Sequence, residues 1–249
     1  MSNHLQALKD RLTQNALFDL PEPLREEVAT WVEHLSDEQR QAAREVLKSD
    51  SHLSAWHHVI THSQFAKQQL LNTVIQTPVL LAIAEGLNSQ WQKADYQQAF
   101  NTWLASAEDE ATFDRRIRLW RNAMMVRSIW RDLNRIAETL EITAELTHFA
   151  DVAIEQALNF HYRKLVIDRG EPRNDAGQPM PMLVLGMGKL GAYELNLSSD
   201  IDLIFAYPES GETVITQPKP GRKPSCRSSY RIHTSLRVTH CPFLSLRCA

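Results

Sequence analysis

Apolar residues recur with helical spacing along most of the first 170 positions of the chain. The clearest early set follows prolines 21 and 23 and consists of Leu24, Val28, Trp31, Val32 and Leu35. Ser36 and Gln39 then form the capping-box pattern that opens a helix. Between Leu24 and Glu171 the only proline is Pro78, so helix breakers are nearly absent. The pattern predicts a mainly helical domain over residues 1–175.

The longest periodic stretch runs from residue 113 to 140. Its apolar positions predict one buried face: Phe113, Ile117, Trp120, Met124, Ile129, Leu133, Ile136 and Leu140. Arg127, Arg131 and Arg135 recur every fourth residue and form a basic stripe. The simpler interpretation is a solvated face paired with acids such as Asp132 and Glu138. The alternative is that these arginines face a nucleotide site or a protein substrate, since guanidinium groups bind phosphate bidentately.

Two more helical segments flank this stretch. One helix pair is expected from Ser63 to Leu81, broken at Pro78, which cannot donate its amide. Another helix is expected from Ala150 to Asp168, with an inner side of Ala153, Ala157, Phe160 and Leu165. The polar, breaker-rich segment 170–179 follows, which places a domain boundary near residue 175.

Three histidines in the helical part invite a metal interpretation. His58 and His62 lie one helical turn apart, with His57 beside them. No glutamate follows His58 and no third ligand is evident, in contrast to zinc-binding helices. We therefore favour ordinary helix-face histidines over a metal site.

The periodicity changes at residue 183. Leu183 to Leu185 predicts a short buried strand, and three of the eight glycines follow it between Gly186 and Gly191. Because glycine lacks a Cβ atom, such a segment turns tightly and lets its amides approach a phosphate. A brief helical connection and a second strand are expected next.

The second strand carries two carboxylates. Alternation places Asp200 and Asp202 on one face, about 6.5–7 Å apart along the strand, and the apolar positions 201, 203 and 205 on the other. Magnesium takes oxygen ligands, usually one or two carboxylates together with substrate phosphates. This spacing therefore predicts a magnesium site for phosphoryl transfer, with Asp200 and Asp202 as ligands.

Charge is distributed unevenly along the chain. The first 212 residues hold 20 basic and 30 acidic residues, a net charge of −10, whereas the remainder carries +7. An acidic body disfavours nucleic acid as a partner. No apolar run approaches the roughly 20 residues that span a bilayer, and the three cysteines are all at position 226 or later. We expect a soluble, cytoplasmic protein without membrane or nucleic-acid partners.

The segment from Gly186 to Gly191, followed by Glu194-Leu195-Asn196 and by Ser198 to Phe205, resembles a known signature. It is similar to the nucleotidyltransferase motif of the bifunctional glutamine synthetase adenylyltransferase/adenylyl-removing enzymes, specifically their N-terminal, adenylyl-removing half. Segments 130–133 and 145–151 resemble the helical lead-in of that family. The resemblance covers about residues 1–212.

The resemblance implies a function and a set of roles. The parent enzyme removes AMP from an adenylylated tyrosine of glutamine synthetase, with phosphate as the attacking group and ADP as product. Asp200 and Asp202 would bind Mg²⁺, and Gly186, Gly188, Lys189, Gly191 and Ser199 would contact nucleotide (ADP or ATP) and phosphate. Ser199 is equally explained as a turn residue. A PII-type signalling protein and glutamine are the implied regulators.

The resemblance stops where the family would supply a third carboxylate. From residue 213 the chain is basic and has no acidic residue. This tail is expected to be poorly ordered, either because it is out of frame or as a native basic extension. Without the third carboxylate we expect little activity from this chain alone. The alternative is a non-catalytic helical interaction module with a relic nucleotide site.

The sequence thus predicts an α+β fold. A helical domain, residues 1–175, precedes the incomplete mixed sheet of a nucleotidyltransferase domain, residues 176–212. The tail, residues 213–249, follows.

Overall fold

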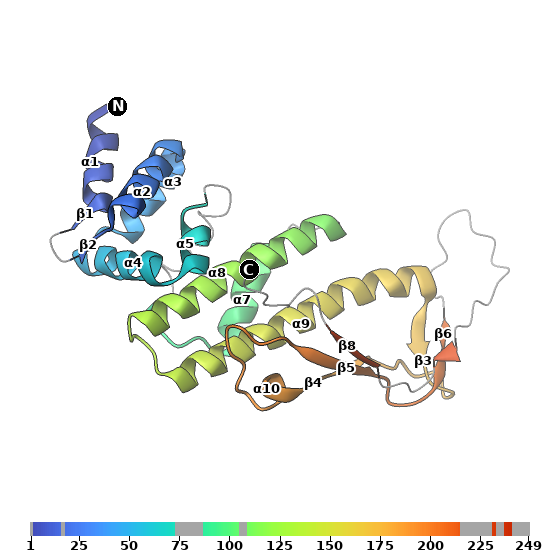
Figure 1. The fold of residues 1–249 in the computed structure, drawn as a ribbon. Coiled ribbons are helices and arrows are strands. Elements are labelled where there is room, and N and C mark those ends of the chain that lie inside the picture. Colours follow the sequence, from blue (N-terminus) through green and yellow to red (C-terminus); the bar gives the residue numbers. More distant parts are fainter. Residues whose placement is uncertain are drawn as a thin grey trace. The chain divides into compact units, whose positions relative to one another are not determined.

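The computed structural model of the chain describes residues 2–15, 18–72, 87–104, 109–214, 231–232 and 237–240. The chain forms two compact units, one up to Phe149 and one from Ala150 onward (Figure 1). The predicted α+β class with a predominance of helix is confirmed.

The described residues of the first unit are helical apart from one pair of two-residue strands. Its elements are α1 Ser2–Thr13, β1 Gln14–Asn15, β2 Phe18–Asp19, α2 Glu22–His34, α3 Asp37–Val46, α4 Asp50–His62, α5 Gln64–Leu70, α7 Lys93–Leu104, α8 Glu110–Leu133 and the start of α9 Thr139–Arg169. Within it α1 packs on α2, and α8 packs on α4, α5 and α7. Pro78 and the second helix of the predicted pair lie outside the described residues.

Side-chain caps fix several helix starts in this unit. The predicted capping box is confirmed, because Ser36 accepts from the Gln39 amide at 3.2 Å and Gln39 accepts from the Ser36 amide at 2.9 Å. Asp109 caps α8 by accepting from the Thr112 amide at 2.8 Å. Each cap satisfies an amide that lacks a partner within its helix.

The core of the first unit uses the predicted apolar positions of α2 and of most of α8. Leu24, Val28, Trp31, Val32 and Leu35 are all buried. Trp31 stacks on Trp56 of α4 with ring centroids 5.9 Å apart, and Trp120 meets Phe149 at 4.7 Å.

The predicted buried face of residues 113–140 extends seven residues, about two turns, beyond the end of the helix. The helix α8 ends at Leu133, where Asn134 caps it, so the periodicity no longer applies beyond that point. Ile136 is exposed and Leu140 is 81% exposed. The assignment of these two residues to the core was wrong.

The second unit begins within α9, which contains the predicted helix 150–168. Ala153 is buried as expected, but Leu165 is 54% exposed, so its placement on the inner side was wrong. The strands of this unit are β3 Glu171–Arg173, β4 Leu183–Gly186, β5 Asp202–Ala206, β6 Gly211–Val214, β7 Arg231–Ile232 and β8 Arg237–His240, with the short helix α10 Gly188–Gly191 between β4 and β5.

These strands form two three-stranded sheets, in the orders β3-β6-β7 and β4-β5-β8, and the described pairings are antiparallel (Figure 1). Two short pieces of the basic tail, β7 and β8, therefore pair with β6 and β5. That the tail is poorly ordered, and that it is out of frame, are still predictions. No helix in the described part of the chain has the length and hydropathy needed to cross a membrane.

Candidate functional site

The glycine turn is hydrogen-bonded directly to β5, the strand that begins at Asp202. β4 pairs with β5 so that Gly186 lies opposite Leu203. The next residue, Met187, donates its amide hydrogen to the Asp202 carbonyl oxygen at 3.0 Å. The predicted order of strand, glycine turn, brief helix and second strand is therefore found, and the turn lies beside Asp202.

Two of the three glycines in the turn have separate structural reasons, close backbone packing at Gly191 and a positive φ at Gly188. A Cβ atom on Gly191 would lie 2.6 Å from the Gly186 carbonyl oxygen, so any side chain would force the backbone apart. Gly188 has a φ of +55°, which side chains rarely adopt, although open space surrounds it. The turn thus depends on Gly191 for space and on Gly188 for conformation.

Asp200 and Asp202 lie where alternation predicted. Both are exposed, while Ile201 and Leu203 between and beyond them are buried. β5 begins at Asp202, so Asp200 lies just before the strand. Neither carboxylate makes a hydrogen bond or ion pair with the residues that the structure describes.

Asn196 organises the approach to the aspartates, a role that the sequence patterns did not single out. Its side-chain oxygen accepts from the Ser199 hydroxyl at 2.6 Å and from the Ser198 amide at 3.2 Å. Ser199 is buried and its amide donates to the Asn196 carbonyl oxygen. This Asx-type turn fixes the backbone immediately before Asp200. Asn196 was part of the motif, but only the folded turn shows that its side chain accepts hydrogen bonds from Ser198 and Ser199.

The first strand of the motif differs from its prediction. Leu183 and Leu185 are 47% and 50% exposed, so the expectation of a buried strand was wrong. One face of β4 packs inward and the other does not, as in an antiparallel sheet with one open face. A continuous apolar run of three residues cannot distinguish these cases.

The donor set suits one magnesium ion rather than a metal pair. Two exposed carboxylates together with phosphate oxygens match the usual coordination of Mg²⁺. Among the described side chains, no group of three His, Cys, Asp or Glu is arranged to hold a metal. Lys189, in α10 of the glycine turn, is exposed and adds a positive charge on the same segment. Two carboxylates and one lysine are side chains of the kinds that magnesium-bound phosphate requires.

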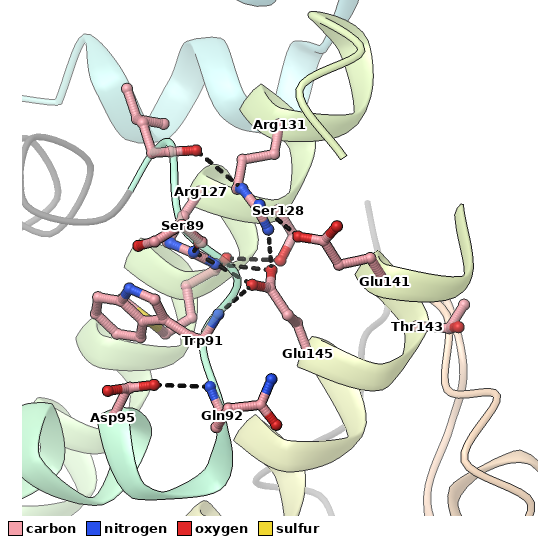
Figure 2. Close-up of polar contacts among 12 residues, drawn as sticks. Ser89, Trp91, Gln92, Asp95, Arg127, Ser128, Arg131, Glu141, Thr143 and Glu145 are labelled. Carbon is pink, nitrogen blue, oxygen red and sulfur yellow. Dashed lines mark hydrogen bonds and ion pairs between the residues drawn. The ribbon is translucent and has the colours of Figure 1, made fainter. Parts of the chain in front are cut away.

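The arginine stripe in the first unit is a buried ion network, and its interpretation as a solvated face was wrong (Figure 2). Arg127 and Arg131 are buried, and they pair with Glu145 and Glu141 of α9 rather than with Asp132 or Glu138. Their guanidinium groups are occupied by internal carboxylates, so they do not face a phosphate site. Only Arg135, beyond the end of α8, is exposed.

The network also fixes the segment that leads into α7. Arg127 Nη2 donates to the Ser89 carbonyl oxygen at 2.6 Å, Arg131 Nε donates to that of Leu87 at 3.0 Å, and Glu145 accepts from the Trp91 amide at 2.7 Å (Figure 2). Burial, and then the Glu145 carboxylate, raises the pKa of the neighbouring Tyr96 hydroxyl. The cluster therefore links α8, α9 and the segment before α7.

The histidines of α4 serve different contacts. His57 is buried, with Nε2 2.7 Å from the Leu12 carbonyl oxygen. His58 Nδ1 lies 3.3 Å from the Asn134 side-chain oxygen, and His62 Nδ1 lies 2.8 Å from the His58 carbonyl oxygen. These contacts account for the three side chains without a shared ligand.

Comparison with known proteins identifies the family. The family model described as "Glutamate-ammonia ligase adenylyltransferase" matches residues 53–225, which include the glycine turn and both aspartates. A bifunctional glutamine synthetase adenylyltransferase/adenylyl-removing enzyme from Acinetobacter baylyi is 43% identical over 142 residues, 51% of this chain. The protein of the same name from Shewanella oneidensis is 38% identical over 171 residues, 64% of this chain.

The matched segments cover 15% and 18% of those two proteins, so the chain spans only a small part of their length. Because the family model extends over more than half of this sequence, the chain belongs to the glutamate-ammonia ligase adenylyltransferase family.

Proposed function

We propose that this chain contributes the site at which AMP is removed from an adenylylated tyrosine of glutamine synthetase. The observation that carries the proposal is the hydrogen bond from Met187 to Asp202, which holds a glycine turn against an exposed carboxylate pair. The names of the two relatives include an adenylyl-removing activity on glutamine synthetase.

The proposed reaction is a phosphorolysis. An oxygen of orthophosphate forms a bond to the adenylyl phosphorus, and the bond from that phosphorus to the tyrosine oxygen breaks. The tyrosine oxygen takes up a proton and ADP is released. Negative charge accumulates around the phosphorus, so groups fixed to receive it lower the barrier most.

The residues of the site divide into two roles under this proposal. Asp200 and Asp202 would hold Mg²⁺, which would neutralise charge on the phosphate oxygens. Lys189 and the turn from Gly186 to Gly191 would position the phosphates. Ser199 supports the turn through Asn196, and its hydroxyl oxygen retains acceptor capacity toward a ligand.

The remaining parts of the proposal concern context. Little activity is expected from this chain alone, because two carboxylates balance the charge of a single magnesium ion and not of a pair. A PII-type signalling protein and glutamine would regulate the complete enzyme. The cytoplasm is the proposed location, in agreement with the absence of cysteine before residue 226.

Calorimetry distinguishes this proposal from a non-catalytic helical interaction module. ADP titrated into the chain should release heat in the presence of Mg²⁺ and much less in the presence of EDTA. The combined change Asp200→Asn and Asp202→Asn should abolish the magnesium dependence. An interaction module with a relic site would give no heat with either nucleotide or metal.

A further inference from the structure

The β4-β5 sheet leaves a row of apolar side chains open to solvent. Leu183 and Leu185 of β4 are 47% and 50% exposed, and Met187, which follows the strand, is 44% exposed. Residues two apart in an extended strand point to the same side. Met187 keeps this geometry, with φ −103° and ψ 167°, so the three side chains share one face.

Pairing across the sheet carries this face into the proposed metal site. Leu185 lies opposite Ile204, and the register continues to Met187 opposite Asp202, where the amide of Met187 bonds to the Asp202 carbonyl oxygen at 3.0 Å. Side chains of directly opposed residues lie on the same face. The Asp202 carboxylate therefore stands at the end of an exposed apolar row.

The other face of the same sheet is already covered. A Cβ atom on Gly186 would contact the side chain of Leu190, which places α10 against the face of Gly186 and its partner Leu203. Leu190, Leu203 and Ile201 are all buried. The short helix thus packs on the face opposite the apolar row, whose β4 side chains and Met187 are exposed.

We propose that Leu185, Met187 and Ile204 form the platform that receives the base of an adenine nucleotide. This inference rests on the proposed function, because the phosphates must lie at Asp202 and the glycine turn. Two residues along a strand span about 7 Å. The pair formed by Leu185 and Ile204 therefore lies about that far from Asp202, a distance that the ribose of a nucleotide can bridge. Small-molecule sites combine apolar walls with a few polar groups in this way.

Leu183 supplies a matched control. It lies on the same strand and the same face as Leu185, with nearly equal exposure, but one row farther from Asp202, opposite Ala206. The platform predicts that the base reaches Leu185 and not Leu183. If the row were instead a docking face for a protein, substitutions at Leu183 and Leu185 would not differ in their effect on nucleotide affinity.

The test measures dissociation constants of ADP and of pyrophosphate, each with Mg²⁺, by calorimetry on the full 249-residue chain. Leu185→Ser and Met187→Ser should each weaken ADP binding about tenfold, the factor that corresponds to ~1.4 kcal/mol, and leave pyrophosphate unchanged. Leu183→Ser should leave both constants unchanged. Leu185→Met should restore ADP affinity, which a loss of fold would not allow.

Two results would overturn the platform: ADP affinity unchanged in Leu185→Ser, or an equal loss in Leu183→Ser. The first would also be expected if the row instead docks a protein. Failure of the proposed function appears differently, as pyrophosphate binding that is absent or that is insensitive to the combined Asp200→Asn and Asp202→Asn change. Such a result would remove the platform as well.

Discussion

Arg127 and Glu145 form a two-pronged ion pair in which both side chains are wholly buried. The distances are 2.8 Å from Nη1 to Oε2 and 3.2 Å from Nη2 to Oε1. Arg131 Nη1 adds a charge contact at 2.7 Å from Oε2, without hydrogen-bond geometry. The Glu145 carboxylate of α9 therefore contacts two guanidinium groups of α8, and Glu141 supplies the second negative charge. The helices depend on Glu145 because a buried unpaired charge is costly.

Glu145→Gln should destabilise the helical unit by about 3–5 kcal/mol, because it leaves buried positive charge without its partner. Chemical denaturation followed by circular dichroism measures the change. Glu138→Gln is the control: Glu138 is exposed, and surface changes usually stay within about 0.5 kcal/mol. Equal stability of the two variants would contradict the structural role of the network.

The pattern of arginines illustrates what the sequence could and could not provide. The spacing correctly placed Arg127 and Arg131 on one face of a helix. It did not predict which residues that face contacts. Their partner Glu145 lies on a different helix, 18 residues beyond Arg127, and no local rule links the two. The prediction that Ile136 is buried was wrong for a related reason. The apolar periodicity of α8 continues in the sequence past Asn134, where the helix ends.

His57 should make the first unit less stable in mild acid. Burial lowers the pKa of His57, against a smaller opposing effect of its contact with Leu12. The unfolded chain, with a histidine pKa of about 6.5, therefore binds a proton before the folded chain does. Stability is fully present above that value, falls as the pH decreases below it, and levels off below the folded pKa.

Unfolding midpoints measured between pH 5 and 8 check this expectation. His57→Gln should flatten the slope below pH 6.5, since the titrating group is gone. His62→Gln, at an exposed position on the same helix, should keep the original slope because His57 is still in place. A slope that persists in His57→Gln would assign the acid sensitivity to another group.

Alanine should be more harmful to the turn at position 191 than at position 188. Gly191→Ala places a Cβ 2.6 Å from the Gly186 carbonyl oxygen, so it should displace the turn from β5 and weaken Mg²⁺-ADP binding by at least about tenfold. Gly188→Ala meets open space and costs only the left-handed conformation, about 1–2 kcal/mol. Calorimetry on both variants would contradict this account if Gly188→Ala proved the more harmful.

Asn196→Ala should weaken Mg²⁺-ADP binding without unfolding the sheet. It removes the acceptor that holds Ser199 at 2.6 Å, and such a hydrogen bond contributes about 1 kcal/mol, or roughly a fivefold change in affinity. Asn174→Ala is a matched control, because Asn174 also accepts from a backbone amide, that of Gln178, but beside β3. Equal losses in both variants would indicate a general structural effect.

The exposure pattern around the two aspartates was the part best predicted by local pattern. Alternation placed Asp200 and Asp202 outward and Ile201 and Leu203 inward, as the structure has them. The exposure of Leu185 was missed, since an apolar strand looks alike whether one face or both are covered. The function of Asn196 depends on a turn that closes only in the folded chain.

Phosphate-dependent release of ADP from adenylylated glutamine synthetase tests the role of Asp200 and Asp202 most directly. Residues 1–212 of this chain would be joined to the corresponding continuation of the Shewanella oneidensis relative, and the product would be separated by chromatography. That relative alone is the positive control, and the 249-residue chain shows what its own residues achieve.

The joined protein should form ADP only when phosphate and Mg²⁺ are present. Asp200→Asn combined with Asp202→Asn should lower the rate by about 100-fold or more, the scale on which removal of transition-state charge stabilisation acts. ADP release at an unchanged rate from the doubly substituted protein would contradict the assignment of the deadenylylation site to these aspartates.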